Sequence, residues 1–249
     1  MSELRGATDI GAYLVSARSF EEYRAMFALT DADLCGRVLD CPGGGASFAA
    51  SARQRGTEVF AVDPVYATPP QQLVARLDAE LARASAWAVA NAERYVWDHY
   101  GDPAAHAWLR AGSAAAFGHD LLGTPGRYVA AALPDLPFRD GAFDLVLCSH
   151  LLFTYADRLD ADFHVRALLE MARVGAEVRV YPLVDQAGRQ LPELLSHVLR
   201  TLDGSGVHAG VEEVGYEFQR GARTMLRLRP TRTGVRRADP PTPGGTMPA

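Results

Sequence analysis

A glycine-rich turn and an acidic residue about twenty positions later are the first features able to bind a ligand. Residues 37–41 form an apolar run, the turn covers Asp40–Ala46, and a second β-rich run at 58–62 ends at Asp63. Glycines let the backbone approach a ligand at the carboxyl edge of a parallel sheet, and an acid there can accept hydrogen bonds from both hydroxyls of a ribose. The pattern predicts a site for a nucleotide-like cofactor, with a plain tight turn as the alternative.

A histidine and two aromatic residues follow a later apolar run. His150 comes just after the strand expected at 143–148, at the edge where open α/β sheets bind ligands. Its ordinary pKa would suit proton removal near neutral pH, so we predict that it acts as a catalytic base. Phe153 and Tyr155 could form an aromatic wall against a flat substrate, and we count Tyr155 with His150 as catalytic. The alternative is that these side chains order the loop and pack the next helix.

The glycine turn does not match the dinucleotide fingerprint. In the pattern GxGxxG the third glycine would fall at position 48, where Phe48 stands, and only a very small residue there allows close packing of helix on strand. An NAD(P)-dependent oxidoreductase is therefore the disfavoured alternative.

Composition excludes several further classes of protein. The 249 residues contain 25 basic residues, all of them arginine, so the lysine of P-loop nucleotidases, pyridoxal enzymes and protein kinases is missing. A net charge of −5 argues against broad binding to nucleic acid. Three cysteines without metal-ligand spacing predict neither a disulfide framework nor a metal site. Without a leader or an apolar run long enough for a membrane span, we expect a cytoplasmic protein that acts on a small molecule.

Alternating strand and helix patterns indicate an α/β fold. A capping box at Ser19–Glu22 predicts a helix through Leu29. Residues 69–122 read as a helical cap inserted between the second and third strands, with one helical pattern from Pro69 to about Tyr100 and another from Pro103 to Leu122. Other helices are expected at 46–55, 160–174 and 191–202, and strands at 128–131, 143–148, 177–181, 207–218 and 224–228. The last two strands read as a hairpin with its turn at 219–222. We expect one domain over residues 1–230 and a flexible tail rich in proline and glycine at 231–249.

From residue 36 to about 229 the chain resembles class I S-adenosylmethionine-dependent methyltransferases. Val38–Phe48 is similar to their first motif, Asp63 to their ribose-binding acid, and Leu133–Phe138 with Asp140–Val146 to their third- and fourth-strand region. The resemblance implies a Rossmann-like, mostly parallel seven-stranded sheet with an antiparallel last strand and helices on both faces. It implies S-adenosylmethionine as cofactor and methyl transfer to a small molecule. The implied cofactor-binding residues are Asp40, Cys41, Gly43, Gly44, Asp63, Ala132, Leu133 and Ser149, with His150 beside the methyl donor.

The first motif departs from the family pattern at two positions. Pro42 replaces a first glycine and Ala46 a third, and an alanine run takes the place of the acid near the adenine, for which Asp135 is a candidate substitute. A binding module that keeps the fold without catalysis is therefore a second hypothesis.

Two further groups are weaker candidates. Tyr95, Trp97, His99 and Tyr100 could face the site from the cap or form a small core of their own. Arg220 could clamp an acidic group of the acceptor or lie in solvent.

Overall fold

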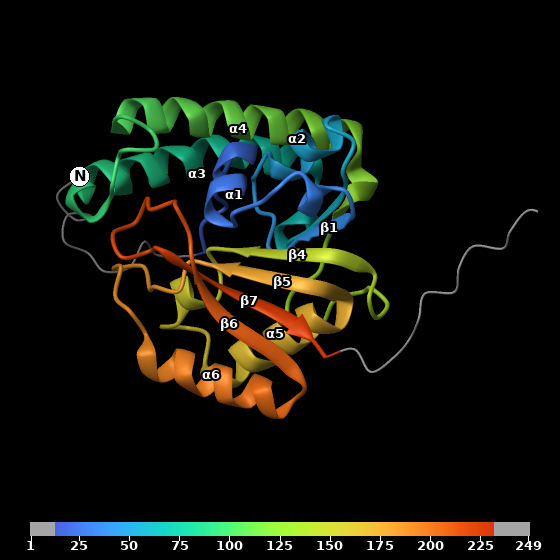
Figure 1. Ribbon diagram of the computed structural model, residues 1–249. Helices are drawn as coiled ribbons and strands as arrows, with labels where there is room; N and C mark the ends of the chain where they lie inside the picture. Colours follow the sequence, from blue (N-terminus) through green and yellow to red (C-terminus); the bar gives the residue numbers. More distant parts are fainter. Residues whose placement is uncertain (1–12, 232–249) are drawn as a thin grey trace, which may run out of the picture.

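A seven-stranded mixed sheet forms the centre of the molecule in the computed structural model, which describes residues 13–231 (Figure 1). Its strand order is β3-β2-β1-β4-β5-β7-β6. The strands are β1 (Arg37–Asp40), β2 (Glu58–Val62), β3 (Tyr128–Val129), β4 (Phe143–Ser149), β5 (Gly175–Tyr181), β6 (Val207–Glu213) and β7 (Thr224–Pro230). Neighbours from β3 to β5 are parallel, whereas β7 is antiparallel to both β5 and β6. The predicted Rossmann-like α/β fold with an antiparallel last strand is confirmed.

The chain reverses its direction of travel across the sheet between β1 and β4. These two strands pair in parallel register, with Leu39 opposite Val146, and both of these side chains are fully buried. The connection after β1 leads to β2 on one side, whereas β4 lies on the other side of β1. Open α/β sheets bind ligands at such a point, outside the carboxyl ends of the strands. The glycine turn and the Ser149–His150 step both lie there.

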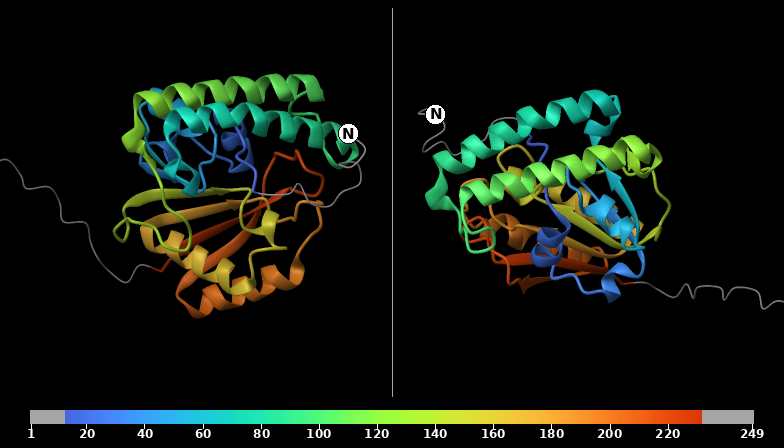
Figure 2. Two further views of the ribbon diagram at one scale, coloured as in Figure 1. Left: turned by 180° about the vertical axis from the view of Figure 1, so that it is seen from behind. Right: turned by 90° about the horizontal axis from the view of Figure 1, so that it is seen from above.

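Helices cover both faces of the sheet (Figure 1). On one face lie α1 (Phe20–Met26), α2 (Phe48–Gln54), α3 (Pro70–Ala90) and α4 (Pro103–Gly123); on the other lie α5 (Ala161–Val174) and α6 (Pro192–Gly204). The two long helices α3 and α4 run side by side (Figure 2). Leu73 of α3 and Phe117 of α4 belong to the same buried apolar cluster as Val38 of β1. The inserted helices therefore share the core of this layer.

Two predicted boundaries are wrong, and one contact explains both. Helix α3 ends at Ala90 instead of Tyr100, and β6 ends at Glu213 instead of Phe218. The segment after α3 pairs with the connection 214–223, because the Val96 N–H donates to the Phe218 carbonyl at 2.7 Å. The connection is therefore a long loop that reaches the helical layer, not a four-residue turn.

The capping box at the start of α1 is confirmed. The Glu22 N–H donates to Ser19 Oγ at 3.2 Å, and the Ser19 N–H donates to Glu22 Oε2 at 2.8 Å. The helix ends at Met26, before the predicted Leu29, and Ala28 adopts a positive φ of 48°. Arg110 on α4 donates through Nη1 to the buried Glu22 at 2.9 Å. The N-terminal segment is thus tied to α4.

Within residues 13–231, no helix is long and apolar enough to cross a membrane. The tail predicted at 231–249 lies outside the described residues, apart from residue 231.

Replacing Glu22 by glutamine should destabilise the fold strongly. The amide leaves the buried Arg110 guanidinium without its counter-charge, and breaking one side of a buried ion pair costs about 3–5 kcal/mol of unfolding free energy. Urea denaturation followed by circular dichroism measures the loss. The control is Glu21→Gln at the exposed neighbouring position of α1, expected within about 0.5 kcal/mol of the parent. Equal stability of the two variants would show that the ion pair is dispensable.

Candidate active site

Two cavities adjoin each other at the carboxyl edge of the sheet. The first, the sheet-edge cavity, has a volume of about 460 Å³ and is lined mainly by residues 41–44, 62–65, 131–133 and 149–151. The second, the helical cavity, has a volume of about 340 Å³ and is lined mainly by residues 14–18, the 80–88 part of α3, the 106–111 part of α4, and Phe218 and Gln219. Five residues line both cavities: Leu14, Val15, Ser16, His150 and Tyr155. The two spaces therefore meet at this set of side chains.

The glycine turn has no room for larger residues. A Cβ on Gly43 would lie 2.5 Å from Tyr66 Oη and 2.9 Å from Ala61 Cβ, and Gly44 has a φ of +51°. The departure at Ala46 is accommodated because this side chain is buried in the core. The turn therefore brings its backbone to the wall of the sheet-edge cavity, as the sequence predicts.

The amides of this turn are engaged within the protein. The Gly44 N–H donates to Asp63 Oδ2 at 3.0 Å, and the Gly45 N–H donates to the Ser16 carbonyl at 3.1 Å. The backbone of the turn therefore lies at the cavity, as expected of a cofactor turn. Its Gly44 and Gly45 amides, however, donate to Asp63 and to the N-terminal segment.

The two acids of the predicted cofactor site have different environments. Asp63 lines the sheet-edge cavity, and its Oδ1 accepts the Val65 N–H at 2.9 Å. Burial raises its pKa, while these backbone hydrogen bonds oppose the rise. Asp40 is fully buried behind the lining, accepts a hydrogen bond from Tyr23 Oη at 3.0 Å, and has an Oδ2 without a hydrogen-bond partner. Burial raises the pKa of Asp40 well above its usual value, and its hydrogen-bond partner Tyr23 does line the cavity.

The remaining predicted cofactor residues surround the same cavity. Cys41, Ala132, Leu133 and Ser149 all line it with Gly43 and Gly44. Asp135, the candidate substitute for the adenine acid, is exposed and outside the lining. An acid beside an apolar slot suits the ribose and adenine of a nucleoside, so the residues fit the adenosine part of S-adenosylmethionine.

His150 stands at the junction in a strained backbone conformation. Its φ is 51°, its N–H donates to the Tyr181 carbonyl at 2.7 Å, and its Nδ1 lies 2.9 Å from Ser149 Oγ. Burial, with the nearby cations Arg18 and Arg110, lowers the pKa of His150 well below its usual value. The expectation of an ordinary pKa is therefore wrong, because the imidazole lies in a buried and positively charged environment. At neutral pH it is uncharged and a weak base.

Tyr155 holds the N-terminal segment between the cavities. Its Oη accepts the Leu14 N–H at 3.0 Å, and its ring lies 4.6 Å from that of Tyr13. Burial raises its pKa, so the phenol keeps its proton. Phe153 is fully buried in a second apolar cluster, which also contains Leu168 of α5, and it lines neither cavity.

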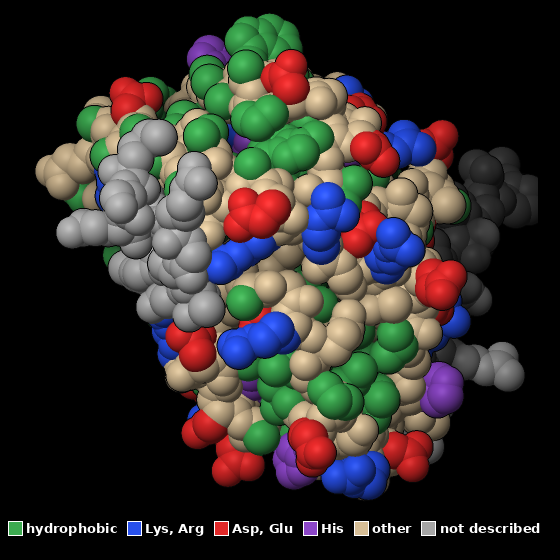
Figure 3. Space-filling model, turned by 90° about the vertical axis from the view of Figure 1, so that its left-hand side faces the viewer, with side chains coloured by type: hydrophobic (Ala, Val, Ile, Leu, Met, Phe, Trp, Pro, Cys, Tyr) green, Lys and Arg blue, Asp and Glu red, His purple; other side chains and the backbone are tan. Residues whose placement is uncertain are grey.

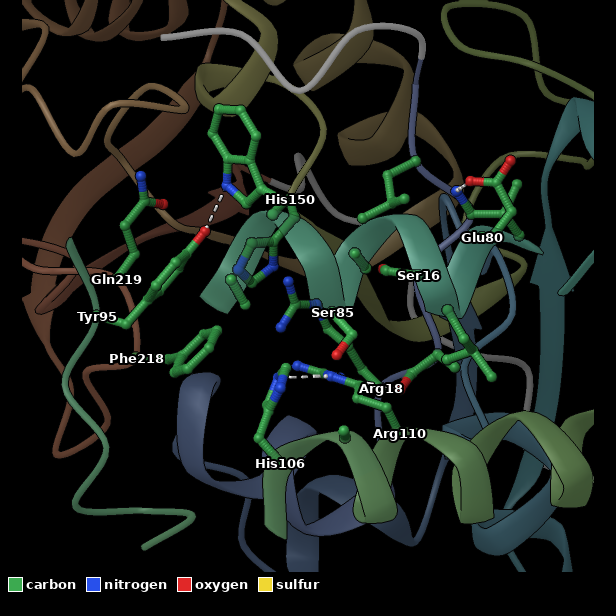
Figure 4. A pocket seen from close by; sticks show the side chains of 18 of the residues that line it. Ser16, Arg18, Glu80, Ser85, Tyr95, His106, Arg110, His150, Phe218 and Gln219 are labelled. Atoms are coloured by element: carbon green, nitrogen blue, oxygen red, sulfur yellow. Dashed lines mark hydrogen bonds between the residues drawn. The ribbon is translucent and has the colours of Figure 1, made fainter. Parts of the chain in front are cut away.

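Sequence reasoning missed the charged groups of the helical cavity. Arg18, His106 and Arg110 turn toward a common space (Figure 4). Arg110 donates through Nε to His106 Nε2 at 3.0 Å and through Nη1 to the Ala17 carbonyl at 2.9 Å. Burial and then Arg110 lower the pKa of His106 to about 3. The i, i+4 spacing of His106 and Arg110 in a helix was the available signal, but it could not reveal that α1 supplies the counter-charge.

Of the four aromatic residues expected to face the site or to form a small core, one lines a cavity and three do not. Tyr95 lines the helical cavity and stacks on Phe218 with ring centres 4.6 Å apart. Trp97, His99 and Tyr100 lie outside the lining and pack around residues of the 214–223 connection.

Arg220 is exposed to solvent and lines neither cavity. Its Nε donates to the Glu93 carbonyl at 2.8 Å, which fastens the connection to the segment after α3. Residues 13–231 contain no group of three or more histidine, cysteine, aspartate or glutamate side chains that could hold a metal ion.

Part of the chain matches a known protein family. Residues 88–177 match the family described as "Methyltransferase domain". Uncharacterized protein MJ0045 of Methanocaldococcus jannaschii is 24% identical over 213 residues, which cover 85% of this chain and 94% of that protein.

Two solved structures are also similar. The 1,6-didemethyltoxoflavin-N1-methyltransferase of Burkholderia thailandensis, with 1,6-didemethyltoxoflavin and S-adenosylhomocysteine bound, is 18% identical with a TM-score of 0.44 over 84% of this chain and 78% of that one. A SAM-dependent methyltransferase from Aquifex aeolicus is 14% identical with a TM-score of 0.41 over 84% of this chain and 95% of that one.

The family matched by residues 88–177 and the strand order both agree with the resemblance of the motifs to class I S-adenosylmethionine-dependent methyltransferases.

Gly43→Ala should weaken cofactor binding. The added methyl group collides with Tyr66 Oη and Ala61 Cβ, and relieving such overpacking costs about 1–3 kcal/mol, so the dissociation constant for S-adenosylhomocysteine should rise about tenfold or more. Isothermal titration calorimetry measures it. Gly112→Ala on α4, where a Cβ meets no atom within 4 Å, is the control. Unchanged affinity in Gly43→Ala would contradict the placement of the cofactor beside the turn.

Acid should destabilise the protein partly through His106. Because its pKa is lowered to about 3 in the folded state, the unfolded chain binds the additional proton between about pH 6.5 and that value. The unfolding free energy should therefore fall as the pH falls, by up to about 1.4 kcal/mol per pH unit from this group.

His106→Gln keeps an acceptor for Arg110 and removes the titration. Its unfolding free energy should fall less steeply than that of the parent between pH 6 and pH 4.5 in urea denaturation. His119→Gln, at an exposed position of the same helix, is the control. Parallel curves for the parent and His106→Gln would refute a role of this histidine.

Proposed function

We propose that this enzyme transfers a methyl group from S-adenosylmethionine to a small molecule that binds in the helical cavity. The observation that carries the proposal is the shared lining: Ser16, His150 and Tyr155 each face both cavities. A donor in one cavity and an acceptor in the other would meet at this set of side chains. Methyl transfer is an in-line displacement, so this alignment is the main contribution that the protein can make.

The sheet-edge cavity would hold the cofactor. We assign binding to Cys41, Gly43, Gly44, Asp63, Ala132, Leu133 and Ser149, with Asp40 acting behind them through Tyr23. Asp63 would face the ribose, and the alanine segment would face the adenine. When bound, S-adenosylmethionine supplies the reactive methyl group.

His150 and Tyr155 would orient the acceptor at the junction. The uncharged imidazole can hydrogen-bond an acceptor hydroxyl or amine, and an anionic substrate beside Arg18 would raise its low pKa toward the range of a useful base. Tyr155 would act by fixing Leu14, and hence the wall between the cavities.

The size and surroundings of the helical cavity favour a small molecule over a macromolecule. Its volume of about 340 Å³ falls in the usual range of small-molecule sites, about 300–1,000 Å³. Acidic and basic side chains are intermingled on the face shown in Figure 3, which gives no continuous basic surface there for a nucleic acid.

Filling the helical cavity should block turnover and spare the cofactor. Ala84 of α3 lines this cavity, so Ala84→Phe should reduce methyl transfer about tenfold or more by displacing the acceptor, with affinity for S-adenosylhomocysteine unchanged within about twofold. The assay measures S-adenosylhomocysteine formed with a low-molecular-weight metabolite extract, and in parallel with total RNA. Ala79→Phe, on the exposed side of α3, is the control. Turnover only with RNA, or full turnover in Ala84→Phe, would contradict the proposal.

A further inference from the structure

We infer that the helical cavity selects acceptors bearing a carboxylate, and that Arg18 binds this group. The inference rests on the proposed function because it names the class of small molecule for the same cavity. It depends on the state of one guanidinium group that lines this space.

Arg18 is largely buried, and two of its nitrogens have no hydrogen-bond partner. Its side chain is 11% exposed, and neither Nε nor Nη1 has a hydrogen-bond partner. The carboxylate oxygen Glu22 Oε1 lies 3.6 Å from Nη1, beyond hydrogen-bond length. Buried polar groups are normally hydrogen-bonded, and an unpaired one destabilises the folded state. A ligand with acceptor oxygens would remove this destabilisation.

The backbone of Arg18 is fixed, so the side chain is presented to the cavity from a rigid base. Its carbonyl accepts the Ser47 N–H at 2.9 Å and Ser113 Oγ at 2.8 Å. Figure 4 shows Arg18 beside Arg110 among the side chains around the cavity. The side chain therefore starts from a backbone position that two hydrogen bonds fix.

The buried group of Glu22, Arg18 and Arg110 carries one positive charge that no carboxylate within the group compensates. Glu22 forms an ion pair with Arg110 at 2.6 Å, so one carboxylate faces the two cations Arg18 and Arg110. Glu80, the acid that lines the cavity itself, is bonded to Arg76 and Arg83.

The two histidines add no charge near neutral pH. The pKa of His106 and that of His150 are both lowered, first by burial and then by the arginines. A ligand with a single negative charge would balance the site, which matches a carboxylate better than a phosphate dianion.

The rest of the lining indicates the chemistry of the part of the ligand that does not contact Arg18. Apolar side chains form most of the wall, among them Leu81, Trp87 and Phe218. Gln219 and Ser85 are among its polar side chains. A compact apolar or aromatic acid fits this combination of surface and charge.

Arg18 is absent from the lining of the sheet-edge cavity, whereas Arg76 contributes to it. The carboxylate of the cofactor itself is therefore not the group assigned to Arg18.

Matched acids and amides test the inference without requiring turnover. Isothermal titration of the protein saturated with S-adenosylhomocysteine uses 4-hydroxybenzoate against 4-hydroxybenzamide, hexanoate against hexanamide, and phenyl phosphate. We expect at least one acid to bind about tenfold more tightly than its amide. Arg18→Gln should abolish this preference and leave the affinity for S-adenosylhomocysteine within about twofold. Arg24→Gln, which removes a charge at the surface of α1, should preserve the preference.

Several results would overturn the inference. These are equal binding or no binding of every acid and amide pair, tighter binding of phenyl phosphate than of both acids, or a tenfold loss of S-adenosylhomocysteine affinity in Arg18→Gln. If Arg18→Gln does not fold, Arg18→Lys keeps the charge, and the acid preference should persist in it. Failure of the proposed function would appear differently, as acid binding without methyl transfer to any small molecule.

Discussion

The buried ion pair between Glu22 and Arg110 is the interaction on which the arrangement of the site depends. Glu22 closes the capping box of α1, and Arg110 also donates to the Ala17 carbonyl. Together they hold the segment 13–18 against α4, while Tyr155 and Glu80 bind its first residues. Because this segment forms the wall shared by the two cavities, its position determines where a donor and an acceptor can meet.

The same ion pair contributes to the electrostatics of the site. Burial first, and then the two guanidinium groups that share one carboxylate, lower the pKa of both neighbouring histidines. His150 is consequently better suited to hydrogen bonding than to holding a proton until an anion binds near Arg18. Acceptor charge and proton transfer would then be coupled, because the ligand that balances Arg18 also restores basicity at the junction.

The sheet and the residues at its carboxyl edge that line the sheet-edge cavity could be predicted from the sequence because their signals are local. The glycine turn, Asp63 and the apolar runs of β1 and β4 each occupy a few consecutive residues. The acceptor end could not be predicted, because Arg18, Arg110 and Phe218 come from three distant segments that only tertiary packing brings together. Asp40 was placed correctly in the turn, but its burial behind Tyr23 depends on α1. The same dependence on tertiary contacts explains the misplaced ends of α3 and β6.

A crystal structure with S-adenosylhomocysteine bound tests the central claim most directly. The account predicts the adenosine in the sheet-edge cavity, its ribose hydroxyls within hydrogen-bond distance of Asp63, and its sulfur at the wall formed by Ser16 and His150. The sulfur should face the space beside Arg18. Adenosine in the helical cavity, or a sulfur directed away from the junction, would contradict the assignment of the two cavities to donor and acceptor.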